Sequence, residues 1–347
     1  MPNTSKNRRL PAEWEPQSGV MITWPHIHSD WIDSLDKIQE VYLQLVKAIT
    51  RFEKLLIIAY DDEHLSLIKS QLDAANQDET NIIYSINRTN DTWTRDYGPI
   101  TLDKKNDHIL DFRFNGWGNK FDASLDTKVT PALVSSNIFK TENLTSAEFV
   151  LEGGSIESDG KGTLLTTSDC LLTDTRNTLY TKESISEIIE STLGVNKILW
   201  LEHGYLSGDD TDSHIDMLAR FTDTDTIVYV KCEDKNDEHY ESSCKMEAQL
   251  KTFTNWEDKP YKLQSLPFPD PVFDEDGRRL PASYANFLII NGAVLVPIYN
   301  DKHDQKALSI IGKCFPDREI IGIPFLAAIE QNGSLHCLTM QIPKGYL

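Results

Sequence analysis

Reactive side chains gather in four short segments of the chain, each beside Gly, Pro or Trp in strand-like surroundings. Together the segments contain a thiol, imidazoles and several carboxylates. A thiol can act as a nucleophile, and imidazoles and carboxylates can transfer protons or hold a charged substrate, so the set is compatible with nucleophilic catalysis. The four segments are Asn90–Pro99, Leu151–Ser155, Asp209–Asp216 and Gly333–Gln341.

Taken singly, each segment also has a purely structural explanation. Asp91 and Asp96 can be turn residues before a Gly-Pro pair, and Glu152 can be a solvated strand end. The acidic run 209–212 lacks the spacing and the terminal Glu of an EF-hand loop, which argues against a calcium site. Cys337 lies in a Leu-rich pattern, where a buried thiol is the usual explanation.

The spacing of the candidates argues against four unrelated coincidences. Asp96, Glu152 and His214 follow one another at roughly sixty residues, and Cys337 lies about two such steps further on. The later helices recur at a similar interval, each followed by a strand and a turn, which suggests about five copies of one unit. In a ring of equivalent units, equivalent strand ends meet at the axis. We therefore expect these side chains to share one central pocket.

Short β-rich runs alternate with amphipathic helices, and no linker or low-complexity tract interrupts them, so the sequence predicts a single α/β domain over residues 1–347. Gly194 has the position of a C′ glycine directly after the expected helix Lys182–Leu193. The expected helices are Asp36–Arg51, Asp62–Ala75, Lys182–Leu193, Ser242–Phe253 and Lys302–Cys314, with a weaker one near Thr130–Lys140. The expected strands are Leu55–Tyr60, Asn81–Ile86, His108–Phe114, Gly162–Thr167, Lys197–Leu201, Thr226–Val230, Phe287–Ile298 and Glu319–Ile323.

The charge of the chain limits its partners. The formal net charge is -20, which makes a nucleic acid or an anionic membrane an unsuitable partner and suits a small cation. An acidic surface that keeps the protein soluble explains the same charge, and we give this explanation precedence. No apolar run approaches the roughly 18 residues that span a bilayer, and no signal peptide is visible, so we expect a cytoplasmic protein.

The five cysteines form neither a CxxC motif nor close pairs. Their odd number argues against a disulfide framework and against a structural zinc site. We expect no metal and no organic cofactor, because the nucleophile and the acid–base groups are all protein side chains.

The motifs together resemble the agmatine deiminase family, also described as bacterial-type peptidylarginine deiminases. The resemblance runs from about Leu10 to Gln341 and implies a five-bladed, pseudo-symmetric α/β propeller (pentein-type), in agreement with the repeat. It also implies an enzyme that hydrolyses a guanidine, with a homodimer as a plausible assembly. The segments that carry it are Leu10–Pro16, Thr23–Pro25, Thr92–Pro99, Glu152–Ser155, Thr211–Asp216 and Gly333–Cys337.

The resemblance assigns roles to individual residues. Cys337 is the expected nucleophile, which attacks the guanidinium carbon and forms an S-alkylthiouronium intermediate. His214 is the expected acid and base, and Glu152 is expected to orient it or balance its charge and to contact the substrate. Asp96 and Asp216 are expected to hold the guanidinium. Further substrate-binding candidates are Trp93, Asp91 and Asp210.

An acidic pocket raises the pKa of a thiol, which is unfavourable for a thiolate nucleophile. We therefore hypothesise that the bound cationic substrate offsets Asp96 and Asp216 and so helps to deprotonate Cys337. The carboxylates of the loop from Phe268 to Arg279, Asp274 among them, are further candidates for the far end of the substrate.

Agmatine is the expected substrate, and alternatives within and outside the enzyme class remain. Free arginine requires a cation for its carboxylate, for which Arg95 and Arg113 are the candidates. Peptidyl-arginine requires an open groove, and amidino transfer to an amine shares the first half-reaction. A propeller can also be a non-catalytic binding module. Many family members have Gly-Gly-Asn-Ile-His-Cys before the nucleophile, whereas this chain has Asn332–Cys337, which bears on the choice of substrate.

Overall fold

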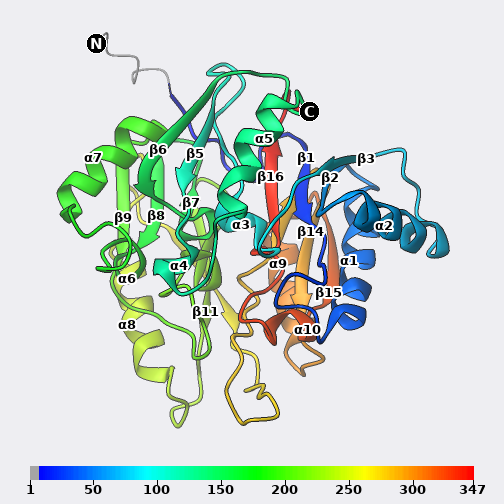
Figure 1. The fold of residues 1–347 in the computed structure, drawn as a ribbon. Coiled ribbons are helices and arrows are strands. Elements are labelled where there is room, and N and C mark those ends of the chain that lie inside the picture. Colours follow the sequence, from blue (N-terminus) through cyan, green and yellow to red (C-terminus); the bar gives the residue numbers. More distant parts are fainter. Residues whose placement is uncertain (1–7) are drawn as a thin grey trace.

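The computed structural model describes residues 8–347, which form five small β-sheets arranged around a centre, with the longer helices outside them (Figure 1). Four sheets have three strands and one has four. The four-stranded sheet has the order β16-β1-β2-β3, with β1 at Gln17–Thr23, β2 at Lys54–Ala59, β3 at Ile82–Ile86 and β16 at Thr339–Pro343.

The other four sheets follow the chain in order. They contain β4 (Ile100–Thr101), β5 (Ile109–Arg113) and β6 (Leu144–Val150); β7 (Ile156–Ser158), β8 (Thr163–Thr167) and β9 (Lys197–Leu201); β10 (Ala219–Phe221), β11 (Thr226–Lys231) and β12 (Lys262–Pro267); and β13 (Leu288–Ile290), β14 (Ala293–Ile298) and β15 (Glu319–Pro324).

Each sheet repeats one topology. Its first strand pairs antiparallel with the second, and the second pairs parallel with the third, as in β4-β5-β6 and β13-β14-β15. In the four-stranded sheet the first strand is β16, from the C-terminal end, which pairs antiparallel with β1 and thereby joins the two ends of the chain. This is the predicted five-bladed α/β propeller.

The helices connect the second and third strands of the units or lie beside them, and their apolar stripes explain their positions. In α1, the residues Ile38, Val41, Leu45 and Ile49 are buried on one face. The α-helices are α1 (Leu35–Ile49), α2 (Asp62–Ala74), α3 (Thr94–Tyr97), α4 (Gly116–Asn119), α5 (Val129–Ser135), α6 (Ser168–Leu171), α7 (Lys182–Leu193), α8 (Tyr240–Leu250), α9 (Asp304–Cys314) and α10 (Leu326–Ile329). The 3-10 turns are η2 (Asp126–Lys128), η3 (Gly153–Ser155) and η4 (Ile215–Met217).

Most of the predicted elements are confirmed within a few residues, and α7 and β9 match their predictions at both ends. Gly194 caps α7 with a left-handed backbone (φ 71°), as predicted. The prediction of one strand over Phe287–Ile298 is wrong. Asn291 and Gly292 form a tight turn that divides it into β13 and β14, and Gly292 adopts the positive φ (77°) that the turn requires.

The first strand of each unit lies next to the centre, and a tight turn precedes it. Such turns are α3 before β4, η3 before β7 and η4 before β10. The turn residues at 284–285 and 335–338 take the same place before β13 and β16. The five turns therefore meet at the axis, and they contain or adjoin the residues that the sequence analysis singled out.

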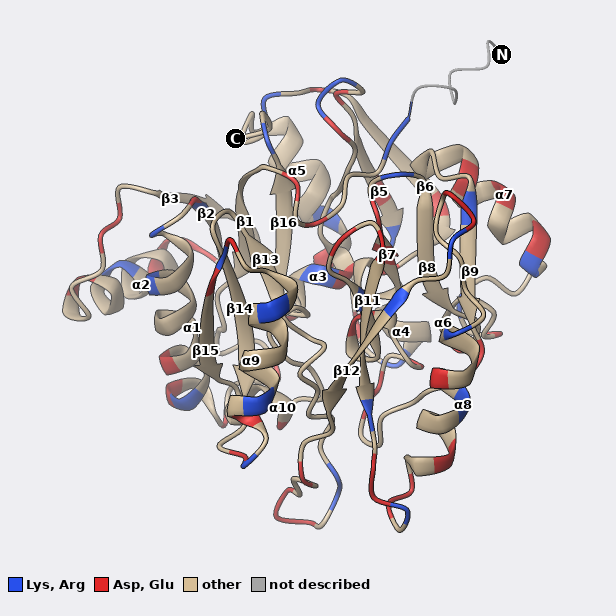
Figure 2. Ribbon diagram, turned by 180° about the vertical axis from the view of Figure 1, so that it is seen from behind, with Lys and Arg blue, Asp and Glu red and all other residues tan. Residues whose placement is uncertain are grey.

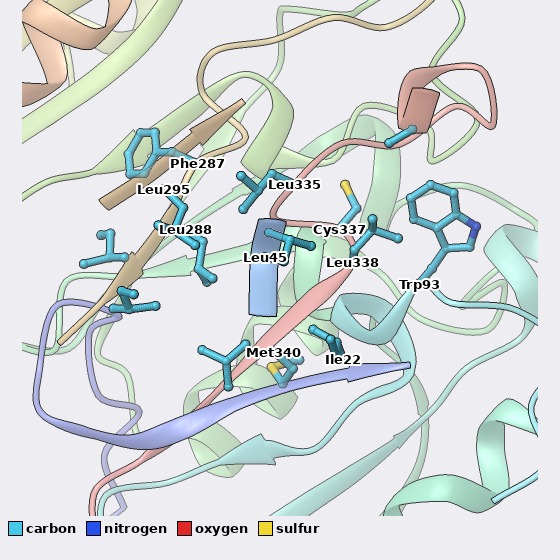
Figure 3. Packing of buried hydrophobic residues seen from close by; sticks show 14 of the residues in the cluster. Ile22, Leu45, Trp93, Phe287, Leu288, Leu295, Leu335, Cys337, Leu338 and Met340 are labelled. Carbon is cyan, nitrogen blue, oxygen red and sulfur yellow. The ribbon is translucent and has the colours of Figure 1, made fainter. Parts of the chain in front are cut away.

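Buried hydrophobic residues support this centre in two clusters. The larger one runs through the middle of the molecule, and Figure 3 shows Leu335, Leu338 and Met340 in it around the start of β16. The smaller cluster packs α7 against the β7-β8-β9 sheet through residues such as Leu164 and Ile185. In residues 8–347, no helix combines the length and the apolar character needed to cross a bilayer.

Candidate functional site

A pocket opens at the axis, between the central turns and the loops that follow them. Five of the predicted site residues line it, namely Asp91, Trp93, Asp96, Asp210 and Cys337. The remaining lining residues, which the sequence does not predict, are Asp30, Trp117, Phe121, Thr211, Gln331, Asn332 and Gly333.

Gly154 marks the point where the inner groups of the site meet. A methyl group added at this glycine would lie 2.6 Å from His214 Nδ1, 2.8 Å from Asp96 Oδ1 and 3.1 Å from Asp216 Oδ2. Asp96 belongs to one unit, His214 and Asp216 to a second, and the glycine that they surround to a third. Gly154 also donates its backbone N–H to Asp96 Oδ1 (3.0 Å). Asp96 and His214 therefore converge as the spacing predicts, although His214 and Asp216 lie behind the pocket lining.

Cys337 lies at the inner end of the pocket, at the start of β16, with the Trp93 indole beside it (Figure 3). Its Sγ is 3.5 Å from Asn286 Oδ1 and 4.0 Å from Asp216 Oδ2. Its carbonyl oxygen accepts a hydrogen bond from Arg95 N (3.1 Å), which fixes the turn 335–338 against α3. Burial raises the pKa of the Cys337 thiol well above its ordinary value, and Asp216 and Asp96 raise it further.

Asn286, which lies just before β13, is the contribution of the β13-β14-β15 unit to the inner site. The sequence analysis expected this contribution from carboxylates of the loop before β13, such as Asp274. Instead Asp274 Oδ2 accepts from Arg278 Nε (2.9 Å), and Asp274 does not line the pocket. Arg278 in turn donates to the side chain of Asn332, so the loop reaches the pocket wall only indirectly. A lone Asn has no motif that would have identified it.

Asp96 and Asp216 are both buried beside Cys337, but their partners differ. Asp96 Oδ2 accepts from Trp117 Nε1 (2.9 Å), and burial together with the neighbouring carboxylates raises its pKa to about 6 despite the opposing effect of His214. Asp216 Oδ2 lies 2.8 Å from His336 Nδ1, whereas Asp216 Oδ1 has no hydrogen-bond partner among the described residues. Burial alone would raise the pKa of Asp216, but His336 and other cations hold it below its ordinary value.

His214 is fully buried, and neither of its ring nitrogens has a hydrogen-bond partner within residues 8–347. Its Nδ1 lies 3.6 Å from Asp96 Oδ1. Burial opposes protonation, but Asp96, Cys170 and Glu152 outweigh it and raise the pKa of His214 to about 10. The imidazole is therefore a protonated group at neutral pH, able to donate a proton to a leaving amine.

The loop before His214 is held in place by its own acidic residue. Asp209 accepts the backbone N–H groups of Thr211 (3.0 Å) and Ser213 (2.9 Å). These bonds stabilise a loop in which Asp212 and Ser213 both have positive φ. The run 209–212 therefore braces the loop that presents His214, and Asp210 alone of its carboxylates lines the pocket.

Glu152 lies near His214, but its direct partner is a residue that the sequence does not predict. Both of its oxygens accept from Arg176 Nε (2.8 and 3.1 Å), and this ion pair is fully buried. A carboxylate oxygen of Glu152, the Cys170 thiol and a ring nitrogen of His214 lie within 4.8 Å of one another. Glu152 does not line the pocket. Its placement suits charge balance of His214 better than contact with a substrate.

The outer part of the pocket combines aromatic rings with carboxylates. Trp93 packs against Trp31 (ring centroids 5.7 Å apart) and against the backbone of Gly333, where a larger residue would collide with the indole. Asp210 Oδ2 accepts from Asn332 Nδ2 (2.6 Å). Burial raises the pKa of Asp91 to about 7, although its bonds to Thr92 oppose the shift and the charge of Asp30 adds to it.

Comparison with known proteins agrees with this geometry. The sequence profile of Porphyromonas-type peptidyl-arginine deiminases matches residues 9–343. This chain belongs to that family.

Relatives of the family cover nearly the whole chain. An agmatine deiminase of Medicago truncatula is 33% identical over 96% of this chain and 96% of its own length. Among solved structures, an agmatine deiminase of C. jejuni with substrate bound has 39% identity and a TM-score of 0.89, with 97% of each chain covered. An agmatine deiminase of Enterococcus faecalis has 30% identity and a TM-score of 0.87, and covers 97% of this chain and 96% of its own. The predicted resemblance to agmatine deiminases is confirmed.

The segment that departs from the family pattern, Asn332–Cys337, meets the pocket only in part. Asn332 and Gly333 line it, whereas Ser334 is buried and its Oγ lies 2.9 Å from the hydroxyl of Tyr299. The serine therefore points into the β13-β14-β15 unit, away from the pocket.

The two cations proposed for an arginine carboxylate lie elsewhere. Arg95 is 3% exposed and donates through Nη1 to Gln341 Oε1 (2.5 Å), on the far side of the central turns. Arg113 is an exposed residue of β5. Neither lines the pocket, and no Lys or Arg is among the described residues that do.

Proposed function

We propose that this protein is an agmatine deiminase, which hydrolyses agmatine to N-carbamoylputrescine and ammonia through an S-alkylthiouronium intermediate on Cys337. The observation that carries the proposal is the lining of the pocket. A thiol and Asp96 lie at its inner end, aromatic rings and further carboxylates line its outer part, and no Lys or Arg of residues 8–347 lines it. Agmatine has a cation at both ends and no carboxylate, and it matches this lining along its whole length.

The inner end suits the guanidinium group. Its N–H donors fit the oxygens of Asp96 and the Asp216 Oδ1 atom that has no partner in the described chain. Charge-assisted hydrogen bonds of this kind are short and strong, and two of them fix the plane of the guanidinium for attack from one face. Cys337 Sγ lies 4.0 Å from Asp216 Oδ2, and this proximity supports attack by the sulfur on a guanidinium that Asp216 holds.

In the first half-reaction, the bound cation favours loss of the Cys337 S–H proton to solvent. The thiolate sulfur then bonds to the guanidinium carbon while the C=N π electrons move to nitrogen, which gives a tetrahedral adduct. His214 donates a proton to one nitrogen, the C–N bond breaks, and ammonia leaves. In the second half-reaction, His214 takes a proton from a water molecule whose oxygen bonds to the same carbon. The C–S bond then breaks, which releases the ureido product and the thiol.

The outer part of the pocket suits the rest of the substrate. Trp93, Trp117 and Phe121 would contain the four-carbon chain, since aromatic faces attract both methylene groups and cations. Asp30, Asp91 and Asp210 would attract the terminal ammonium group. The carboxylate of free arginine would meet these acidic residues instead of a cation, and it would be repelled.

The test is to incubate the purified protein with agmatine, arginine and an N-blocked arginine peptide, and to measure ammonia and the ureido product. Wild type, Cys337→Ser and the control Cys314→Ser are compared, because Cys314 lies at the end of α9, outside the site. We expect turnover of agmatine alone, lost in Cys337→Ser and kept in the control. Turnover of arginine or the peptide instead would overturn the substrate, and amidino transfer without ammonia release would overturn the reaction.

A further inference from the structure

Glu13 belongs to the segment Leu10–Pro16, which the chemistry above does not use. Its carboxylate is 5% exposed and lies behind the central turns, on the side of His336 that faces away from the pocket. Glu13 Oε1 accepts from Ile289 N (2.7 Å), and Glu13 Oε2 accepts from Arg220 Nη2 (2.8 Å). A buried acid that joins several units of the ring so closely is expensive to desolvate, and this suggests a specific role.

The contacts of Glu13 determine which nitrogen of His336 carries a proton. His336 Nε2 lies 2.7 Å from Glu13 Oε2, the same oxygen that accepts from Arg220. Burial raises the pKa of the Glu13 carboxyl, but Arg220 and His336 outweigh it and hold the pKa below its ordinary value. Because this oxygen is an ionised acceptor, His336 Nε2 must be the donor.

The other nitrogen of His336 then faces a second carboxylate. His336 Nδ1 lies 2.8 Å from Asp216 Oδ2. With Nε2 protonated, a neutral ring would present a lone pair to a carboxylate oxygen at hydrogen-bond distance, which is repulsive. A further proton must therefore lie between these two atoms, either on the imidazole or on the carboxyl group.

We infer that Glu13 is a positioning residue, which orients His336 and stabilises its cationic form, so that the shared proton rests on His336 and Asp216 stays ionised to hold a guanidinium. This proton also reduces the repulsion among the buried carboxylates. This inference rests on the proposed role of Asp216 in holding that group.

Charges alternate along the path from the pocket to the rear of the ring. Asp216, His336, Glu13 and Arg220 carry negative, positive, negative and positive charge in turn when the proton is on His336. This order is favourable in a poorly solvated interior. The other titratable or charged groups that face the Asp216–His336 pair are Asp96, His214 and Cys337 on the pocket side, and Arg95, Arg220 and Glu157 behind it.

The experiment compares a cationic ligand with a neutral ligand of the same shape. Binding of butylguanidine and of butylurea is measured by calorimetry in a Cys337→Ser background, with and without Glu13→Gln. The amide removes the negative charge and points a donor at Arg220 or at Ile289 N, so His336 loses the stabilisation of its cationic form and the shared proton passes to Asp216. We expect butylguanidine to bind about tenfold more weakly, because a charge-assisted bond is lost, and butylurea to bind as before.

The matched control is Glu15→Gln in the same segment. Glu15 pairs with Arg9 (2.5 Å) and does not touch His336, so both ligands should bind as in the parent protein.

Other outcomes decide against the inference. Equal losses for butylguanidine and butylurea would show a general structural role for Glu13, and unchanged binding of both would show no role. If Glu13→Gln does not fold, Glu13→Asp decides, because it keeps the charge but withdraws it from His336. A smaller loss confined to butylguanidine supports the inference, and any other result overturns it. Neither ligand carries the terminal amine of agmatine, so the result is independent of whether agmatine is the substrate.

Discussion

The Cys337 sulfur lies 4.0 Å from an oxygen of Asp216, and the residue is only 3% exposed. Both features raise the pKa of the thiol, so the empty enzyme contains little thiolate at neutral pH. A guanidinium bound between Asp96 and Asp216 cancels their charge and favours the thiolate. The sequence analysis predicts the same behaviour, and the geometry gives it a physical cause.

Alkylation measures this effect directly. We expect iodoacetamide to modify Cys337 slowly in the free enzyme at neutral pH, and faster when a guanidinium too short to cover the thiol is added. Cys244 is an exposed thiol and serves as the internal control, whose rate should not respond. Peptide mass spectrometry follows both cysteines in one sample. Fast modification of Cys337 in the free enzyme, with a low apparent pKa, would contradict the idea.

Asp96 sets the expected pH dependence of substrate binding. Its pKa is raised to about 6, so it is ionised above that pH and protonated below it. Because only the ionised form attracts a guanidinium, kcat/KM should fall about tenfold for each pH unit below this value. His214, with a pKa of about 10, keeps its proton on both sides of this step and does not contribute to it.

The inhibition constant of butylguanidine separates Asp96 from the outer carboxylates. Asp91 has a pKa of about 7, but it lies where the terminal amine of agmatine would bind. Butylguanidine lacks that amine, so its inhibition constant should depend on pH near 6 and not near 7. A constant that does not change down to about pH 5 would show that Asp96 does not hold the guanidinium.

At the scale of elements, the tight turn before each inner strand determines the site. In η3, the turn places Gly154 against His214 and Asp96. A methyl group has no room there, since it would lie 2.6 Å from a ring nitrogen. Gly154→Ala should therefore displace the side chains of His214 and Asp96. A displacement of about 1 Å can lower kcat roughly 100-fold. Steady-state kinetics with agmatine checks this.

A glycine outside the site provides the control for that substitution. Gly312 lies in α9, where an added methyl group meets only Ile320 Cγ1 at 3.4 Å. Gly312→Ala should leave kcat unchanged, and helix propensity should raise the free energy of unfolding by up to about 1 kcal/mol. If Gly154→Ala retains full activity, the inner groups do not have to meet at this turn.

Most of the outer elements could be predicted from the sequence, but the outer strands β6 and β12 and most of the inner strands were not expected. Helices such as α1 and α7 have several turns over which an apolar stripe is visible. The inner strand β4 has only two residues, too few to show any alternation. Asn286 belongs to no motif, and Glu13 reaches the site from the first turn of a distant segment. Side chains of this kind become recognisable only when the ring brings the units together.

At the scale of the whole molecule, the acidic residues do not converge on the pocket alone. In Figure 2 they are spread over α7, α8 and the connecting loops, with basic residues among them. The net charge of -20 is therefore mainly a property of the outer surface. This distribution agrees with the precedence given to solubility over substrate steering. The local carboxylates of the pocket are sufficient to attract a dication at short range.

The ring is closed by β16 and β1, which come from opposite ends of the chain. In Figure 1 the first described residues and the C-terminus lie at the same edge of the molecule. The order of the units around the ring therefore does not depend on where the chain begins, since every unit keeps its two neighbours. A chain whose natural ends are joined, and which is cut elsewhere on the surface, should form the same ring.

A circular permutant tests this. The natural ends are joined by a flexible Gly/Ser linker, and the chain is opened between Lys235 and Asn236, two exposed residues of the loop before α8. We expect kcat for agmatine within about threefold of wild type and a lower free energy of unfolding, because a surface cut removes few contacts. A folded permutant without activity would show that the covalent order of the chain positions the central turns. In that case β16–β1 pairing alone would not be sufficient to bring Cys337 to the other groups of the site.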